Sequence, residues 1–375
     1  LDQGEFYSEF GTFHVSINLP QNYIVAASGT LESESERQYI NQRIQFTKEV
    51  LSNKQLADSL FLQESASQFK TVQFVAADVH DFAWFADKSF LIQYDTVQLT
   101  NVRLVACYSY FSSPDFWDES VQSVKKSIRF YSEQLGDYPY PQASAVESSL
   151  GVGGGMEYPM VTVIGPTYSK NYLDEVIAHE VGHNWLYGIL ASNERAHPFM
   201  DEGINTFYEN KYVLTRENES IANEKISLFK KITGNTNMSQ LQYQIFARQG
   251  LDQFPNQSAK RFSELNYGLD VYYKTAWFFD YLEQYLGKSK FKEIMQAYYE
   301  AWKFKHPYPE DLKELFLQKT GNDFSWLYDK LLSSDFKCDY AISKIKLKKD
   351  SVLVTISNKK TITAPIQIGM IAKDS

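Results

Sequence analysis

The stretch His179-Glu180-Val181-Gly182-His183 lies in a run with helical spacing that begins near Tyr172. Two histidines at positions i and i+4 share one face of an α-helix, one turn apart. Their imidazoles can therefore reach a single Zn²⁺, whose bonds to histidine nitrogen are about 2.0–2.1 Å long. Glu180 follows the first histidine directly, so its carboxylate can reach a water at that ion and act as a general base.

A catalytic zinc needs a third protein ligand, which is often a carboxylate. Glu202 follows His183 after a gap of 18 residues and opens a second helical pattern. His197 lies in the intervening segment and is a rival ligand, although it stands in an irregular stretch beside a proline. The residue types and spacing favour Glu202 and leave His197 as the alternative.

The spacing His-Glu-x-x-His, 18 residues and Glu resembles the zinc signature of the aminopeptidase N-type gluzincins. Asp201-Glu202-Gly203 is similar to that family's Asn-Glu-Gly. The resemblance assigns His179, His183 and Glu202 as ligands of one Zn²⁺ per chain, and Glu180 as the catalytic base. The family also keeps a glutamate at the position of Glu209, which could orient a ligand histidine. A solvated helix charge is the alternative interpretation of Glu209.

A second matching motif lies upstream of the zinc helix. Gly153-Gly154-Gly155-Met156-Glu157-Tyr158 resembles the family's Gly-Ala-Met-Glu-Asn exopeptidase motif, with tyrosine in place of the final asparagine. Glycines let an extended backbone come close to a peptide. The resemblance therefore implies a substrate-binding segment, in which the Glu157 carboxylate meets the free α-amino group through a charge-assisted hydrogen bond. Its members are Gly154, Gly155, Met156 and Glu157. A flexible glycine turn with a surface glutamate is the alternative.

A third match is Tyr272-Tyr273-Lys274, which lies in another helical run. The family carries Tyr-x-Lys-Gly there, and alignment on Lys274 selects Tyr272, with Tyr273 as the alternative. The resemblance implies that the Tyr272 hydroxyl donates a hydrogen bond to the oxyanion of the tetrahedral intermediate. Thr275 stands where the family usually has glycine.

The rest of the chain divides into three zones by its hydropathy pattern. Residues 1–114 alternate apolar and polar side chains, as half-buried strands do, with one helical interruption at about 34–53. Residues 115–335 carry long helical patterns, and residues 336–375 return to strand patterns, with a third strand expected at 361–371. We expect these zones to be an N-terminal β domain, a catalytic domain and the start of a β-sandwich.

The predicted fold class is multidomain α+β. The resemblance implies a thermolysin-like, mainly helical catalytic domain with a small β-sheet, flanked by partial all-β domains. Because both flanking domains look incomplete against the family, we expect the chain to be truncated. After His183 the family usually continues x-Trp-x-Gly-Asn, but here Gly188 comes one position late, and the loop Ser192-Asn193-Glu194-Arg195 is unusual. These departures indicate a divergent, bacterial-looking branch.

Composition narrows the classes of partner. The chain has 46 acidic and 37 basic residues, and its net charge of −9 argues against a nucleic-acid surface. We expect no transmembrane segment, because no apolar run approaches the roughly 20 residues that a membrane helix needs. Cys107 and Cys338 have no metal or redox spacing. The first residues do not read as a targeting segment, so the compartment stays open, with the cell envelope or an extracytoplasmic location favoured. The oligomeric state also stays open.

The resemblance implies a zinc aminopeptidase that acts on peptide substrates. A zinc endopeptidase of the same fold is one alternative, and a second, epoxide-opening activity occurs in one relative of the family. A non-catalytic peptide-binding or scaffold module is the alternative from another class. Such a module should lose zinc ligands or Glu180, and all four positions are retained here.

Overall fold

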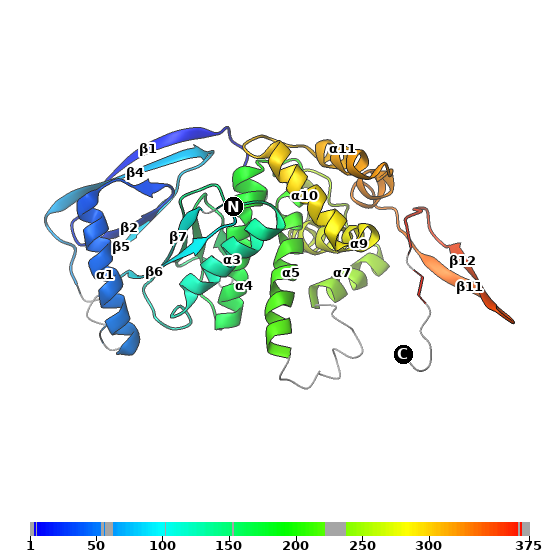
Figure 1. Ribbon diagram of the computed structural model, residues 1–375, viewed down its shortest axis with the longest axis horizontal. Coiled ribbons are helices and arrows are strands. Elements are labelled where there is room, and N and C mark those ends of the chain that lie inside the picture. Colours follow the sequence, from blue (N-terminus) through cyan, green and yellow to red (C-terminus); the bar gives the residue numbers. More distant parts are fainter. Residues whose placement is uncertain are drawn as a thin grey trace.

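The computed structural model describes residues 4, 6–53, 56, 63–101, 103–151, 154–221, 238–366 and 368–369. Strands of the N-terminal part lie at one end of the molecule, helices fill the middle, and a β-hairpin lies at the other end (Figure 1). Strands and helices are thus combined in an α+β architecture, as the sequence predicts.

Among its described residues, the N-terminal part has two small antiparallel sheets and one helix. A three-stranded sheet has the order β1-β4-β3, and a second sheet pairs β2 with β5. The bounds are β1 Gly11–Pro20, β2 Ile24–Ala27, β3 Thr30–Leu31, β4 Phe69–Val79 and β5 Trp84–Asp87. Alternation in β1 buries Ile17 and Leu19 against Val72 and Phe74 of β4, which is why this segment forms a strand. The helical interruption expected at about 34–53 is α1 (Glu34–Ser52).

A five-stranded mixed sheet with the order β6-β7-β8-β10-β9 lies beside the central helices. Its strands are β6 Leu91–Gln98, β7 Leu104–Phe111, β8 Gln142–Glu147, β9 Gly155–Met156 and β10 Val161–Ile164. β7, β8 and β10 are parallel neighbours, whereas β6 and β9 run antiparallel to their partners. β6 and β7 lie before residue 114 and the other three strands lie after it, so a single sheet spans the first predicted domain boundary. The domain limits stay predictions.

Helices dominate from residue 120 to residue 331. The helices in the described residues of this stretch are α3 Ser120–Gln134, α4 Lys170–His183, η2 Asn184–Ile189, η3 Pro198–Met200, α5 Glu202–Ile221, α7 Met238–Gln249, η4 Ala259–Arg261, α8 Glu264–Asn266, η5 Tyr267–Lys274, α9 Thr275–Leu286, α10 Lys288–Trp302, α11 Pro309–Thr320 and η6 Trp326–Leu331. The Ser169 side chain caps α4 by accepting a hydrogen bond from the Tyr172 amide. No described helix combines the length and the apolar character that crossing a bilayer demands.

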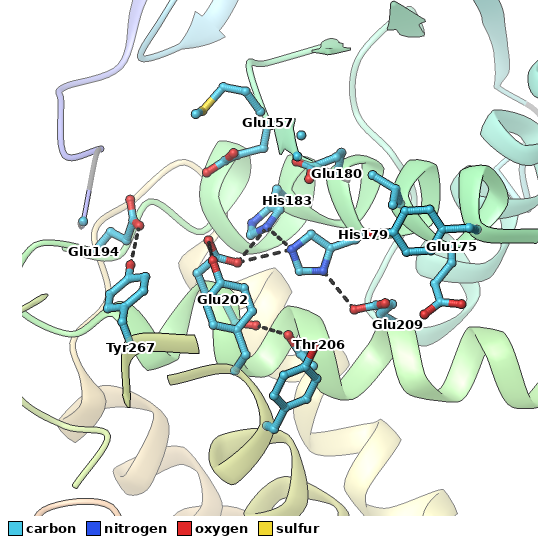
Figure 2. A pocket seen from close by; sticks show the side chains of 18 residues that line it. Glu157, Glu175, His179, Glu180, His183, Glu194, Glu202, Thr206, Glu209 and Tyr267 are labelled. Carbon is cyan, nitrogen blue, oxygen red and sulfur yellow. Dashed lines mark hydrogen bonds and ion pairs between the residues drawn. The ribbon is translucent and has the colours of Figure 1, made fainter. Parts of the chain in front are cut away.

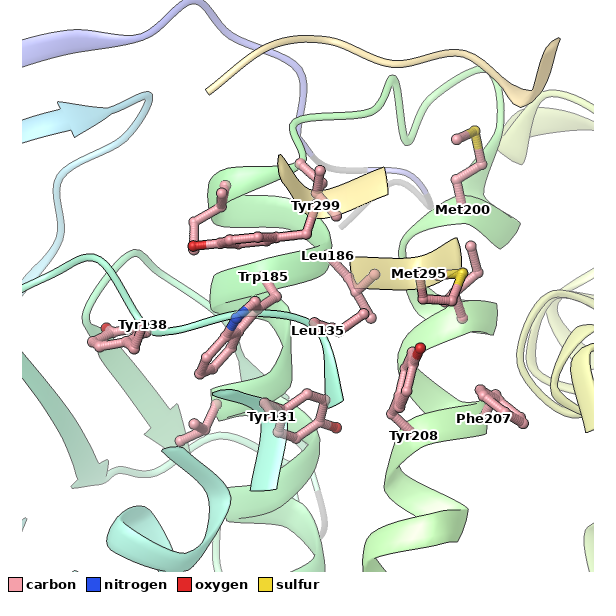
Figure 3. Close-up of a cluster of buried hydrophobic side chains, with 14 of the residues drawn as sticks. Tyr131, Leu135, Tyr138, Trp185, Leu186, Met200, Phe207, Tyr208, Met295 and Tyr299 are labelled. Carbon is pink, nitrogen blue, oxygen red and sulfur yellow. The ribbon is translucent and has the colours of Figure 1, made fainter. Parts of the chain in front are cut away.

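The main core holds the end of α4 in place (Figure 3). Trp185, two residues beyond the end of α4, lies between the rings of Tyr131 and Tyr138, at centroid distances of 5.5 and 5.1 Å. Its indole nitrogen donates to the Gly136 carbonyl at 2.8 Å. A large aromatic side chain with a satisfied polar atom fixes the position of the helix that carries it.

The C-terminal hairpin pairs β11 (Tyr340–Lys348) with β12 (Ser351–Asn358). The third strand expected at 361–371 is wrong for its described part, because residues 361–366 and 368–369 form no strand. The Tyr340 hydroxyl instead donates to the Ala364 carbonyl and accepts from the Ala364 amide. The backbone groups of Ala364 that could pair with a neighbouring strand are thus bonded to a side chain. Residues 367, 370 and 371 lie outside the described residues.

Candidate active site

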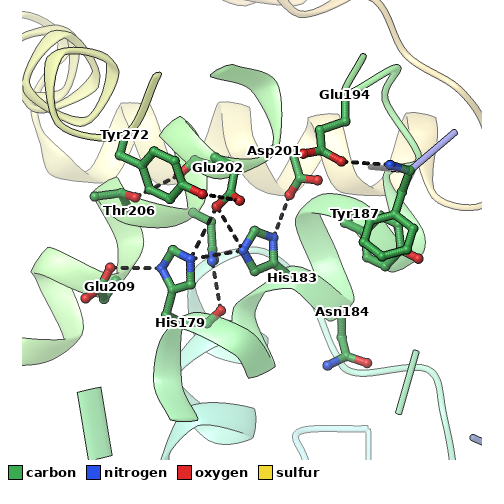
Figure 4. A network of polar contacts seen from close by, with 12 residues as sticks. His179, His183, Asn184, Tyr187, Glu194, Asp201, Glu202, Thr206, Glu209 and Tyr272 are labelled. Carbon is green, nitrogen blue, oxygen red and sulfur yellow. Dashed lines mark hydrogen bonds and ion pairs between the residues drawn. The ribbon is translucent and has the colours of Figure 1, made fainter. Parts of the chain in front are cut away.

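Three side chains from two helices converge at one point (Figure 4). The Nε2 atoms of His179 and His183 are 3.1 Å apart, and Glu202 Oε2 lies 3.3 and 3.2 Å from them. Four-coordinate zinc with bonds of 2.0–2.1 Å separates its ligands by about 3.3 Å. Glu202 Oε2 is also buried without a hydrogen-bond partner among the described residues. Two imidazoles and one orphaned carboxylate oxygen at this spacing fit Zn²⁺.

A carboxylate holds the far nitrogen of each histidine ring. His179 Nδ1 lies 3.0 Å from Glu209 Oε2, and His183 Nδ1 lies 2.6 Å from Asp201 Oδ1. With Nδ1 protonated and donating, the Nε2 lone pair of each ring points to the shared centre. Glu209 therefore has the contact that its family position suggests. The contact of Asp201 was not predicted, and the only signal for it was an acidic residue directly before Glu202.

Close packing between α4 and its neighbours sets the angle of the histidines. Asn205 on α5 donates to the His179 carbonyl at 2.8 Å and accepts a hydrogen bond from the Tyr131 hydroxyl at 3.1 Å. A Cβ atom at Gly182 would lie 2.2 Å from Asn205 Oδ1 and 2.3 Å from the Tyr131 hydroxyl. Only a glycine lets the helices approach this closely.

Glu180 projects from α4 toward strand β9. A Cβ atom at Gly155 would lie 2.0 Å from Glu180 Oε1, so this glycine makes room for the carboxylate. Burial raises the pKa of Glu180 to about 7, and the neighbouring His179 and His183 oppose that rise. A buried carboxylate of raised pKa is a stronger base than an exposed one.

Glu157 follows β9 and is only 6% exposed. One carboxylate oxygen lies within 4.8 Å of ligand atoms of both His183 and Asp201. Burial raises the pKa of Glu157 well above its usual range, while His183 opposes the shift. Gly154, Gly155 and Met156 line the same cavity. Gly153 lies outside the described residues.

Tyr272 and Tyr273 both line the cavity. The Tyr272 hydroxyl donates to Glu202 Oε1 at 2.5 Å, and its ring lies parallel to that of His179 at 6.1 Å. His197 does not join this group, because its Nδ1 pairs with Asn256 Oδ1 at 2.7 Å and it does not line the cavity. Tyr272 therefore contacts the candidate ligand Glu202, and it is the tyrosine that the alignment on Lys274 selects.

These side chains share a cavity of about 460 Å³ (Figure 2). Its described lining includes six glutamates but neither lysine nor arginine: Glu157, Glu175, Glu180, Glu194, Glu202 and Glu209. The sequence did not point to Glu175 or to a role for Glu194, although the loop that carries Glu194 departs from the family pattern. A cavity of this charge attracts cationic groups.

Comparison with known proteins identifies a family. The model of the peptidase family M1 domain matches residues 119–331. The leukotriene A-4 hydrolase homolog of Botryotinia fuckeliana is 24% identical over 173 residues, covering 45% of this chain and 26% of that protein. Leucine aminopeptidase 2 of Yarrowia lipolytica is 25% identical over 165 residues, covering 40% and 24%. The chain thus matches about a quarter of the length of these curated relatives.

Solved structures share the fold at low identity. An M1 zinc metallopeptidase from Deinococcus radiodurans has a TM-score of 0.60 and 14% identity, over 88% of this chain and 65% of that one. Legionella pneumophila aminopeptidase A, in complex with aspartic acid, has a TM-score of 0.64 and 15% identity, over 93% and 38%. The likeness shows a multidomain α+β fold.

Proposed function

Because the chain belongs to peptidase family M1, we propose that it is a zinc aminopeptidase that hydrolyses the first peptide bond of peptides. The observation that carries the proposal is the presence of Glu157 in the same cavity as the three converging ligand side chains. A buried carboxylate beside a hydrolytic centre suits a substrate whose free α-ammonium group lies one residue from the scissile bond.

His179, His183 and Glu202 would hold the zinc ion, and Asp201 and Glu209 would keep the two imidazoles oriented. When bound, the ion supplies a Lewis acid for the scissile carbonyl and lowers the pKa of a water molecule. The donor set supports this assignment, since one carboxylate and two neutral imidazoles leave a fourth position for water or substrate.

Glu180 is the proposed general base. It takes a proton from the attacking water and returns that proton to the leaving amine. Gly155 supports this role by leaving space for the carboxylate against β9. The Tyr272 hydroxyl, which now donates to Glu202 Oε1, is the proposed donor to the oxyanion.

Substrate binding is assigned to the segment from Gly154 to Glu157. In the described part of the chain, β9 is the last strand of the five-stranded sheet, with β10 on one side. A peptide can pair with the backbone of such an edge strand while its ammonium group meets Glu157. An internal peptide bond offers no ammonium group at that position, which favours removal of N-terminal residues over endopeptidase activity.

The test compares aminoacyl-p-nitroanilides with their N-acetylated forms. We expect hydrolysis of the free-amine substrates and at least a hundredfold lower kcat/KM after acetylation, as loss of about 3 kcal/mol of charged hydrogen bonding predicts. Equal cleavage of both forms would remove the role of Glu157. Glu180→Gln should retain zinc by metal analysis and lose turnover, and Glu264→Gln, on the exposed face of α8, serves as the matched control.

A further inference from the structure

Tyr272 lies on η5 (Tyr267–Lys274), which is a π-helix. Helices of this kind are rare, mostly span a single turn and occur often at functional sites. Tyr272 lines the candidate active-site cavity, and its hydroxyl donates to Glu202 Oε1 (Figure 4). Lys274, two positions later, lines a second cavity of about 690 Å³. Residues two positions apart do not face each other on a helix, so the contacts of Lys274 set the rotation of η5 and with it the direction of Tyr272.

Lys274 is anchored in the protein interior and is only 2% exposed. Its Nζ donates to Asp252 Oδ2 at 2.7 Å and to the Gln253 carbonyl at 2.6 Å. The same atom lies 5.6 Å from the centre of the Tyr243 ring, which is a cation–π contact with α7. A buried ammonium held by short, charge-assisted hydrogen bonds keeps one position. The side chain therefore joins η5 to residues 252 and 253.

A second residue of η5 binds the same segment. Asp270 is fully buried, and its Oδ2 accepts a hydrogen bond from the Gln253 amide at 2.7 Å. Asp270 Oδ1 lies 3.8 Å from Lys274 Nζ, so the two side chains, four positions apart, also attract each other. Gln253 thus has its amide bonded to one side chain of η5 and its carbonyl bonded to the other. This pair of contacts resists rotation of η5 about its axis.

The segment between η6 and β11 completes the cluster. It carries Lys337, whose Nζ lies 2.5 Å from Asp252 Oδ1. Two lysines and two aspartates balance each other, as charges taken out of water require. These four charges balance without an added ion, which favours a role in holding η5 over a role as a ligand site. Removal of the Lys274 charge would leave Asp252 paired with Lys337, which limits the loss of stability.

We propose that Lys274 is a positioning residue, which fixes η5 so that the Tyr272 hydroxyl points at the three candidate zinc ligands. The catalytic consequence of this inference rests on the proposed aminopeptidase function. Tyr272 can donate to the oxyanion only from the correct direction, and a misplacement of about 1 Å in an active site can cost about a hundredfold in rate.

The experiment is a double-mutant cycle on the zinc-loaded protein, which measures kcat and KM for the aminoacyl-p-nitroanilide that the wild type hydrolyses best. We expect Tyr272→Phe to lower kcat by about 100–1000-fold, as loss of an oxyanion donor does. Lys274→Met should lower kcat by about tenfold or more and change KM by less than about threefold, because it acts through a contact made in the transition state. In the Tyr272→Phe protein the same change should lower kcat by less than about twofold, because residues that act as a unit are not additive.

Two further variants complete the cycle. Lys274→Arg keeps the charge and the donors, and should restore part of the kcat that Lys274→Met loses. The control is Lys290→Met, which removes an exposed ion pair with Glu293 and should leave kcat unchanged. If thermal melting shows that Lys274→Met is unfolded, Asp252→Asn, which weakens the anchor of Lys274, is carried through the same cycle and decides by the same criteria.

Two kinetic results would overturn the proposal. One is an equal loss of kcat with and without the Tyr272 hydroxyl, which would mean that Lys274 supports the site by another route. The other is a kcat that Lys274→Met leaves unchanged.

Fluorine NMR separates this inference from the proposed function. A single 3-fluorotyrosine in place of Tyr272 reports the surroundings of this ring in the zinc-loaded protein, whether or not peptides are hydrolysed. We expect Lys274→Met to shift or broaden the resonance and Lys290→Met to leave it at the wild-type position. A resonance that Lys274→Met does not change would overturn the role of Lys274. Failure of the wild type to hydrolyse any free-amine substrate would instead overturn the aminopeptidase function, and the resonance would still report what holds Tyr272.

Discussion

At the scale of single residues, Asp201 and Glu209 hold the two candidate ligand histidines on opposite sides of the shared centre (Figure 4). The two contacts are unequal. The pair of His183 with Asp201 is shorter, at 2.6 Å, and both side chains are 1% exposed, whereas the side chain of Glu209 is 18% exposed. The buried contact should therefore matter more for metal affinity.

We predict that Asp201→Asn lowers zinc affinity by about 10–100-fold, the range found when partners of ligand histidines are removed. The amide keeps the shape of the carboxylate but loses the charge that makes the imidazole a better ligand. Competition with a chromophoric zinc chelator measures the change. The control is Asp350→Asn, in the turn of the exposed C-terminal hairpin. A zinc affinity of Asp201→Asn within twofold of the wild type would show that Asp201 does not support the histidine as a ligand.

At the scale of elements, the site depends on how closely α4 approaches α5 and α3. The approach is possible because residue 182 has no side chain, with Asn205 of α5 and Tyr131 of α3 occupying the space. The same approach brings Glu202, the first residue of α5, to the face of α4 that carries the histidines. The packing of α4 against α5 therefore also sets the distances between the candidate metal ligands.

Gly182→Ala tests this crossing, because two effects on the free energy of unfolding oppose each other. Alanine should gain up to about 1 kcal/mol from helix propensity. Overpacking against Tyr131 and Asn205 should cost about 1–3 kcal/mol, so we expect net destabilisation. Chemical denaturation measures it, and zinc content should fall as well. Gly11→Ala, where nothing lies within 4 Å of the added atom, is the control; a more stable Gly182→Ala protein would contradict the account.

At the scale of the whole molecule, the N-terminal part is hydrogen-bonded directly to η2, the helix that follows the candidate ligand His183. His80, just after β4, pairs through Nε2 with the Tyr187 carbonyl at 3.0 Å, and its ring packs edge-on against Tyr187 and Phe10. Gln142 of the central sheet donates to the Ala27 and Gly29 carbonyls at 3.1 Å. Strain or unfolding in the N-terminal part should therefore reach the candidate site.

The His80 contact predicts a pH dependence of stability. Burial lowers the pKa of the His80 imidazole, and the hydrogen bond to the Tyr187 carbonyl only partly opposes this. A folded-state pKa below the ordinary value of about 6.5 means that the unfolded chain binds the proton more readily. The stability that neutral His80 contributes is thus fully present above about pH 6.5, the ordinary pKa, and is lost as the pH falls below it.

His80→Gln can still donate to the Tyr187 carbonyl but does not titrate. We expect the difference in Tm between the wild type and His80→Gln to shift against the wild type as the pH falls from about 7.5 to 5. The exposed His14→Gln is the control, and its difference from the wild type should stay constant. A pH-independent difference for His80→Gln would show that His80 is not held neutral by burial.

Local spacing accounts for what could be predicted. His179, Glu180 and His183 lie within five positions of one helix, where the 3.6-residue repeat alone decides which side chains face the same way. Helical spacing is equally local elsewhere, which is why α1 (Glu34–Ser52) agrees with the helix predicted at about 34–53. The third C-terminal strand failed because a strand also needs a partner, and Tyr340 takes the backbone groups of Ala364.

The sequence by itself determined the helix of the candidate metal site, the kind of ligands and, through the M1 signature, the family. Only the tertiary structure decided which carboxylate orients each histidine ring. It also decided why residues 155 and 182 are glycines and that Glu194 lines the cavity. These contacts join residues from different elements. Their distances depend on how helices and strands pack against one another, and helical or strand periodicity carries no information about that packing.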